Sequence, residues 1–280
     1  MTLSIAVAGK GGTGKTTLCA LLVGALCRTG VRPILAVDAD PNANLAEMLG
    51  VEPGETLAEI REFGASPEGS PPSGIGRVRL IQDHFQRAIS EADGFDLLTM
   101  GRPEGPRCYC AVNSLLRRAL DELAKNYAAV VVDNEAGMEH LSRRTTNEVD
   151  FLVTVLNPTM PSLRAAQRIL ALSRELPVRI GCRAVLVNRV GAEGVGTEIE
   201  EGLARLGASR LPDVPEDREL ERIGAVGGNV WMIREGTPAL AAAVRLAQAL
   251  CGGHAAAGDF PSTGFHALQG RGEPMGRHAL

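Results

Sequence analysis

The chain has 280 residues, of which 45% are hydrophobic, 22% are charged and 3% are aromatic, and its formal net charge is −4. This composition is typical of a globular protein and excludes an extensively disordered, collagen-like or coiled-coil chain. The scarcity of aromatic residues argues against a base-stacking surface, and the lack of a basic excess argues against a general attraction to nucleic acid or anionic membranes.

Short apolar runs typical of buried strands alternate with amphipathic helical patterns along most of the chain. We expect strands at residues 3–8, 33–37, 95–100, 128–132, 151–156 and 183–187. We expect helices at residues 15–28, 44–49, 113–126, 162–176, 197–206 and 238–250. Apolar strands separated by helices indicate a parallel sheet covered on both faces. The pattern predicts an α/β fold, a doubly wound and mostly parallel sheet with helices on both faces, within one domain of residues 1–251.

Two segments do not fit this alternation. Residues 64–76 are rich in Pro, Gly and Ser and predict a polar loop, and residues 252–280 lack an apolar period and predict a disordered tail. No window is long and apolar enough to span a membrane, and the first residues do not resemble a signal peptide. We expect the six cysteines to be reduced thiols of a cytoplasmic protein.

A glycine-rich segment, GKGGTGKTT at residues 9–17, lies between the first expected strand and the first expected helix. It fits the pattern G-x-x-x-x-G-K-[ST] of a phosphate-binding loop (P-loop) in the required context. Glycines let backbone N–H groups turn toward phosphate oxygens, and the helix N-terminus favours negative charge. We expect Lys15 to reach the β- and γ-phosphates of ATP and the Thr16 hydroxyl to ligate Mg²⁺. The residues expected to bind nucleotide here are Gly9, Lys10, Gly11, Gly12, Thr13, Gly14, Lys15, Thr16 and Thr17.

Carboxylates follow two further expected strands. Asp38 and Asp40 follow the second strand, where both could face the phosphates. Asp133 follows the apolar run 130–132, as in a Walker B strand, and we expect it to hold Mg²⁺ through water. We expect Gly137 to supply a backbone N–H that senses the γ-phosphate in a switch loop.

Two cysteines, Cys108 and Cys110, are separated by one tyrosine in a loop between a strand and a helix. Two thiolates at this spacing can both face one soft cation, but they are too few for a tetrahedral site. A twofold axis through the loop would supply four. The other four cysteines lie in apolar patterns and are expected to act as small hydrophobic residues.

The motif GKGGxGKT resembles the deviant P-loop of the MinD/ParA/nitrogenase-iron-protein group of dimeric ATPases. The resemblance implies a homodimer in which Lys10 contacts the partner's nucleotide, a role consistent with the rarity of lysine here, since Lys10, Lys15 and Lys125 are the only three. It also implies that Asp40 orients the attacking water, that Asp38 lies near the Mg²⁺ shell, and that Asn188 binds the purine.

The segments DADPNANL (38–45), DNEAGMEHLSRR (133–144) and NPTMPSLRAAQRI (157–169), together with the cysteine pair, are similar to the CooC-type nickel-associated ATPases. That resemblance implies that Cys108 and Cys110 of two chains bind Ni²⁺, or Zn²⁺ in vitro, and that the client is apo carbon monoxide dehydrogenase.

Other functions remain open on the sequence. The client could be acetyl-CoA synthase, since its maturation ATPase shares these motifs. An iron–sulfur reductase is disfavoured because residues 133–139, the expected switch loop, lack a cysteine. A positioning ATPase on DNA or membrane is disfavoured by the negative charge and by the absence of a basic amphipathic helix in residues 254–280. We therefore expect neither nucleic acid nor membrane as a partner.

Overall fold

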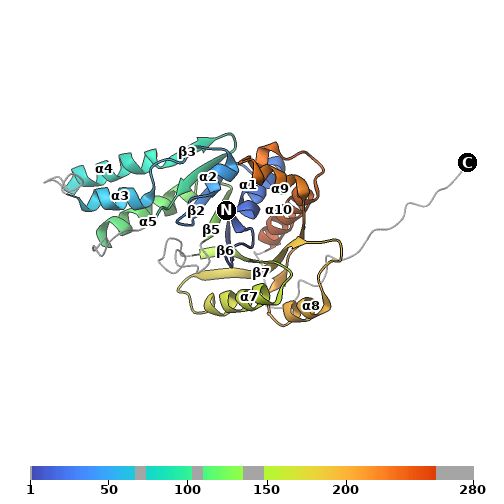
Figure 1. Ribbon diagram of the computed structural model, residues 1–280. Coiled ribbons are helices and arrows are strands. Elements are labelled where there is room, and N and C mark those ends of the chain that lie inside the picture. The colour runs from blue at the N-terminus through green and yellow to red at the C-terminus, as the bar shows by residue number, and fades with distance from the viewer. Residues whose placement is uncertain (1, 67–73, 103–109, 135–147, 257–280) are drawn as a thin grey trace, which may run out of the picture.

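The computed structural model describes residues 2–66, 74–102, 110–134 and 148–256 of the chain (Figure 1). Its core is a 9-stranded sheet with the order β3-β4-β2-β5-β1-β6-β7-β8, from which β9 branches by pairing with β7. The strands are β1 (Leu3–Gly9), β2 (Ile34–Ala39), β3 (Ile89–Ala92), β4 (Phe95–Thr99), β5 (Ala129–Asn134), β6 (Glu148–Leu156), β7 (Arg179–Val190), β8 (Ser209–Arg210) and β9 (Val214–Pro215). All pairs are parallel except β3 with β4, so the predicted doubly wound, mostly parallel sheet is confirmed.

Helices cover both faces of this sheet, as Figure 1 shows. They are α1 (Lys15–Arg28), α2 (Leu45–Leu49), α3 (Leu57–Ala65), α4 (Gly74–Arg87), α5 (Cys110–Ala124), α7 (Met160–Leu172), α8 (Thr197–Ala204), α9 (Arg218–Ala225) and α10 (Pro238–Ala256), with a 3-10 turn η1 (Val230–Met232). Helices α1, α2, α9 and α10 pack on one face. On the other face, α3, α4 and α5 cover β2, β4 and β5, whereas α7 and α8 cover β6 and β7.

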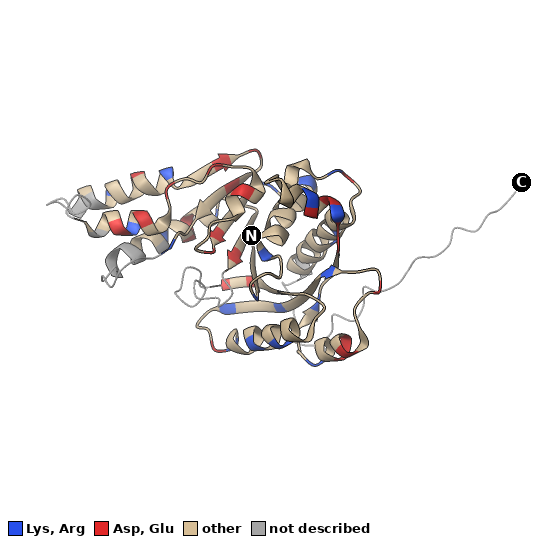
Figure 2. Cartoon of the chain, in the orientation of Figure 1, with Lys and Arg blue, Asp and Glu red and all other residues tan. Residues whose placement is uncertain are grey.

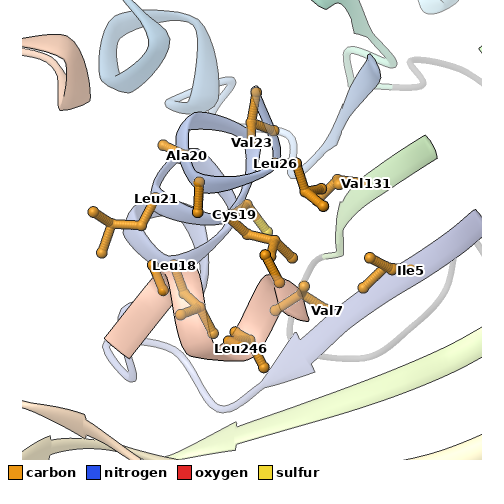
Figure 3. Packing of buried hydrophobic residues seen from close by; sticks show 14 of the residues in the cluster. Ile5, Val7, Leu18, Cys19, Ala20, Leu21, Val23, Leu26, Val131 and Leu246 are labelled. Atoms are coloured by element: carbon orange, nitrogen blue, oxygen red, sulfur yellow. The ribbon is translucent and has the colours of Figure 1, made fainter. Parts of the chain in front are cut away.

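Helix α1 fills the centre of the first face because every residue from Leu18 to Cys27 is apolar and buried. Figure 3 shows Leu26 beside Val131 of β5 and Leu18 beside Leu246 of α10. Burying a leucine of this kind stabilises the fold by about 1.5–3 kcal/mol. This packing fixes the helix that begins at Lys15 directly against the central strands.

Several expected element boundaries differ from the structure by a few residues, and the two segments predicted to be irregular are shorter than expected. The expected loop at 64–76 is shorter, because α3 continues to Ala65 and α4 begins at Gly74, while residues 67–73 lie outside the described ranges. Helix α10 continues to Ala256, so residues 252–256 of the expected tail are helical. Gly253 is buried there, and a Cβ on it would lie 3.0 Å from the Phe151 ring, so this glycine serves close packing rather than ending the helix. Among the described helices, none has the length and apolar character needed to cross a membrane.

Asp217 joins the starts of two helices. One carboxylate oxygen accepts hydrogen bonds from the backbone N–H groups of Glu219 (2.9 Å) and Leu220 (3.2 Å), which caps α9. The other oxygen accepts a hydrogen bond from the N–H of Ala239 (2.9 Å) in the first turn of α10. The residue is 7% exposed, so these charge-assisted bonds are shielded from water.

We predict that Asp217→Ala lowers the free energy of unfolding by about 2–4 kcal/mol, because it leaves three backbone donors unpaired. Urea unfolding of the purified protein measures this change. The control is Glu201→Ala, which removes an exposed ion pair with Arg205 (2.9 Å) and should change stability by less than about 0.5 kcal/mol. Equal effects of the two variants would show that Asp217 does not anchor the helices.

Candidate nucleotide site

The predicted P-loop connects the carboxyl end of β1 to α1. Gly12 and Gly14 have φ angles of 81° and 85°, a left-handed conformation that side chains disfavour. A Cβ added at Gly11 or Gly12 would meet no atom within 4 Å, so the backbone here is open to an approaching ligand. A Cβ at Gly9 would lie 2.5 Å from the carbonyl oxygen of Val155 on β6, so only glycine fits where the loop leaves the sheet.

The two lysines of the loop differ in their surroundings. Lys15 opens α1 and is 7% exposed, and its ammonium interacts electrostatically with the buried carboxylate of Asp133. Lys10 is exposed, and its side chain forms no ion pair with any described residue. The separate roles of the two lysines stay predictions.

Thr13 and Asn188 are in contact although 175 positions separate them. The side-chain amide of Asn188, near the end of β7, donates a hydrogen bond to the carbonyl oxygen of Thr13 (2.8 Å). A Cβ at Gly14 would lie 2.5 Å from the same amide nitrogen, so this glycine also permits the contact. The expected purine ligand Asn188 therefore braces the phosphate loop directly.

Asp38 and Asp133 lie side by side at the carboxyl edge of the sheet. They are register partners of the parallel pair β2–β5, and each is 0% exposed. Successive residues of a strand point to opposite faces of the sheet. Asp38 and Asp133 lie two residues after Ala36 and Val131, which pack on the α1 face, so both carboxylates lie on that face as well. The structure thus brings these two predicted carboxylates together with the P-loop.

The two carboxylates have different hydrogen-bond partners. The oxygens of Asp38 accept bonds from the backbone N–H of Asp40 (3.1 Å) and from that of Leu45 (2.8 Å). Both oxygens of Asp133 are buried and accept no hydrogen bond of ordinary geometry within the described ranges. Asp133 is therefore a buried carboxylate without a backbone donor, and only the side chains of Thr16 and Cys19 are placed to favour its charged form as donors among the described residues.

Burial raises the pKa of both groups to about 6. For Asp38, the hydrogen bond from Leu45 opposes the rise and the neighbouring Asp133 adds to it. For Asp133, the Thr16 hydroxyl and the Lys15 ammonium favour the charged form and limit the rise in pKa. Two buried carboxylates that resist ionisation together are a favourable environment for a divalent cation.

The unpaired oxygens of Asp133, the adjacent Asp38 and the nearby Thr16 hydroxyl fit Mg²⁺, which prefers oxygen ligands. Asp40 is half-buried, and one of its carboxylate oxygens accepts bonds from the N–H and the side-chain amide of Asn42, each at 2.9 Å. In the part of the chain that is described, its other oxygen has no donor and could accept a bond from water.

Some predicted residues cannot be placed. Cys108 and Gly137 lie outside the described residues, and Cys110 is the first residue of α5, with its side chain outside the description. The described residues contain no group of three or more His, Cys, Asp and Glu side chains suited to a metal ion.

Two residues near the site were given no role in the sequence analysis. Asn134 follows Asp133, is 0% exposed and donates a hydrogen bond to the carbonyl oxygen of Val7 (3.1 Å), which ties β5 to β1 just before the P-loop. Cys19, expected to be a core residue, is buried among the apolar residues of α1 as predicted (Figure 3). Its thiol also lies beside the carboxylate of Asp133. The position of Cys19 one turn after Lys15 was the only signal in the sequence that could have suggested this proximity.

We predict that Asp133→Asn increases the stability of the nucleotide-free protein by about 1–3 kcal/mol at pH 7.5, because it removes a buried charge that no backbone N–H group compensates. The pKa of Asp133 is about 6 in the folded state, against an ordinary value of 3.8, so ionisation of this group costs folding free energy at pH values above 6. This cost decreases as pH falls from about 7 toward 4, because the folded protein then carries the carboxyl group in its neutral form. The advantage of Asp133→Asn should therefore shrink as pH falls through 6.

The matched control is Asp38→Asn, which should destabilise the protein because its amide presents a donor where two backbone N–H groups need acceptors. Urea unfolding at pH 7.5 and pH 5, in EDTA without nucleotide, measures both variants. A stability loss of similar size in both would contradict the assignment of Asp133 as an unsatisfied charge.

Comparisons with known proteins agree with this site. Residues 4–230 match the family described as CbiA: CobQ/CobB/MinD/ParA nucleotide binding domain. An uncharacterized ATP-binding protein of Methanocaldococcus jannaschii is 40% identical over 234 residues, covering 82% of this chain and 91% of that protein. The carbon monoxide dehydrogenase accessory protein CooC of Rhodospirillum rubrum is 37% identical over 193 residues, covering 64% of this chain and 72% of that protein.

The fold also matches a solved structure. The septum site-determining protein MinD of Pyrococcus horikoshii, complexed with Mg-ADP, aligns with a TM-score of 0.65 and 23% identity, covering 89% of this chain and 96% of that chain. The family match spans the P-loop, both buried carboxylates and Asn188. The chain therefore belongs to the CobQ/CobB/MinD/ParA family of P-loop nucleotide-binding proteins, and it is an ATPase.

Proposed function

We propose that this ATPase acts as a homodimer in the cytoplasm, binds Ni²⁺ at Cys108 and Cys110 of both protomers, and assists nickel insertion into carbon monoxide dehydrogenase. The observation that carries the proposal is a Cys-Tyr-Cys pair in a chain that is 37% identical to a carbon monoxide dehydrogenase accessory protein. Four thiolates from two chains satisfy the coordination of a soft transition metal, and a reducing compartment keeps them available.

The connection between β4 and the cysteine pair supports coupling between nucleotide and metal. Thr99 at the end of β4 is the register partner of Asp38. The N–H of the next residue, Met100, donates to the carbonyl oxygen of Asp38 (2.8 Å), and the carbonyl of Met100 accepts from Ala58 of α3 (3.0 Å). Cys110 follows ten residues later at the start of α5. A shift of Asp38 on nucleotide binding would therefore reach the segment that carries the thiols.

The proposed roles in hydrolysis follow the geometry of the site. Lys15 would neutralise charge on the β- and γ-phosphates, while Thr16, Asp38 and Asp133 would hold the hydrated Mg²⁺. Bound Mg²⁺ would neutralise charge that develops on the phosphates during transfer. Asp40 would orient the attacking water with its free carboxylate oxygen.

Two further residues would complete the reaction in the dimer. The exposed Lys10 would reach the nucleotide of the partner, as an arginine finger does. Gly137 would sense the γ-phosphate, and Asp38 and Asp40 would complete the switch. Hydrolysis would then depend on dimerisation and would reset the metal-carrying state.

The charge distribution is more consistent with a protein partner than with nucleic acid or a membrane. Figure 2 shows acidic and basic residues interspersed on α3 and α9, and the formal net charge is −4. A protein client is consistent with this surface, and acetyl-CoA synthase is the second candidate. Activation of each apoenzyme by the nickel-loaded protein, with ATP and without it, separates the two.

We predict that Lys15→Ala abolishes ADP binding, whereas Lys10→Ala retains ADP affinity within about twofold and loses at least about a hundredfold in ATP turnover. The reason is that Lys15 is buried at the start of α1, beside the phosphate site of its own chain, whereas Lys10 is exposed. Calorimetric ADP titration and phosphate release measure the two effects, and light scattering should show that Lys10→Ala no longer dimerises with ATP. Undiminished turnover by Lys10→Ala would remove the role in trans.

We predict that Ni²⁺ saturates at about one ion per two chains and that binding weakens as pH falls, because thiolates must lose their protons. Metal analysis alongside light scattering, with ADP and with ATP, gives the stoichiometry. Cys108→Ser with Cys110→Ser should abolish binding, whereas Cys182→Ser with Cys251→Ser, on other elements, should not. Tight binding of one ion per monomer by the first double variant would place the metal elsewhere, and iron with a brown chromophore in anaerobic protein would favour a reductase.

A further inference from the structure

Thr13 uses both of its donors on one acceptor. Its hydroxyl donates a hydrogen bond to the carbonyl oxygen of Lys10 (2.8 Å), and its backbone N–H donates to the same oxygen (3.3 Å). The side chain is 2% exposed and packs against Gly9, whose added Cβ would lie 2.9 Å from the Thr13 hydroxyl. Because the Thr13 N–H points back at Lys10, it is not free for a phosphate oxygen in this conformation.

Thr13 is also held from its other side. Its carbonyl oxygen accepts the hydrogen bond from the Asn188 amide (2.8 Å), and Asn188 is 8% exposed. Asn188 lies where β7 pairs with β9, at an irregularity followed by Arg189 with a φ of 57°. A non-glycine residue in this conformation persists only where the surrounding structure holds it. The position of the Asn188 amide is therefore set by the sheet rather than by the loop.

These contacts form a continuous chain from β7 through Thr13 to the backbone of Lys10. The intervening Gly11 and Gly12 are exposed and would meet no atom with an added Cβ, so they offer no packing of their own to hold the turn. The short bond from the Thr13 hydroxyl is the main side-chain restraint on the Lys10 carbonyl among the described contacts. The orientation of the exposed lysine thus depends on a residue that does not itself face outward.

We propose that Thr13 is a positioning residue: its hydroxyl, braced through Asn188, fixes the backbone of Lys10 so that the lysine is held ready for the nucleotide of a second copy of this chain. The inference rests on the proposed action of Lys10 in trans and adds the device that preorganises it. Holding a catalytic group in place before the partner arrives lowers the entropic cost of assembling the site.

Thr13→Val tests the hydroxyl with almost no change in shape. We expect ATP turnover and ATP-driven dimerisation to fall roughly three- to tenfold, the loss of one net hydrogen bond, with ADP affinity within about twofold of wild type. Thr13→Ser keeps the hydroxyl and should restore turnover, whereas Thr13→Ala should resemble Thr13→Val. The Ser and Ala pair isolates the hydroxyl even if valine perturbs folding.

Thr29→Val is the matched control, because its hydroxyl also bonds to backbone carbonyls (Ala25 at 3.0 Å and Leu26 at 3.1 Å) but lies at the far end of α1. It should leave turnover unchanged. Phosphate release, ADP titration and light scattering are measured for each variant beside Lys10→Ala.

The outcomes separate the inference from the function on which it rests. If Lys10→Ala keeps full turnover, the role in trans fails. If Lys10→Ala loses turnover but Thr13→Val and Thr13→Ala do not, the positioning role alone is wrong. A parallel loss of ADP affinity in Thr13→Val and Thr13→Ala would also overturn it, because the hydroxyl would then be building the binding loop itself.

Discussion

Two carboxylates buried side by side beneath the start of α1 are the constraint on which the nucleotide site depends. Water does not reach Asp38 or Asp133, so the sheet must hold two groups whose ionisation is opposed by burial and by each other. Asp38 is compensated by backbone donors, but Asp133 is not. The apolar packing of α1 and α10 supplies the stability that makes this arrangement tolerable. The buried negative charge that costs folding free energy also makes the site suitable for a hydrated cation.

The same edge of the sheet gathers the parts that nucleotide binding must coordinate. β1 delivers the P-loop, β2 and β5 deliver the carboxylates, and β7 delivers Asn188 to the back of the loop. β4 leaves the sheet through Met100, which is bonded to both β2 and α3. These strands of one sheet therefore place the P-loop, both carboxylates, Asn188 and the segment that follows β4 at a common edge.

Much of the fold followed from periodicity alone, because apolar strands and amphipathic helices have distinct patterns, and α1 was predicted with its observed bounds. Helix α3 was missed although Thr56 and Glu59 form a capping box, a local signal hidden by the polar composition that follows it. The P-loop could be found because its chemistry requires a contiguous motif. The contact between Thr13 and Asn188 could not, since it joins residues that only the sheet order brings together.

The two borders of the sheet have a consequence for how copies of the protein can associate. One border is the four-residue β3, which runs antiparallel to its neighbour, and the other is formed by the two-residue strands β8 and β9, which both pair with β7. Short border strands offer few free backbone groups to a neighbouring molecule, which discourages lateral fusion of sheets and the aggregation that follows from it. In the proposed dimer, contacts between copies would then form through loops and helix surfaces rather than through paired strands.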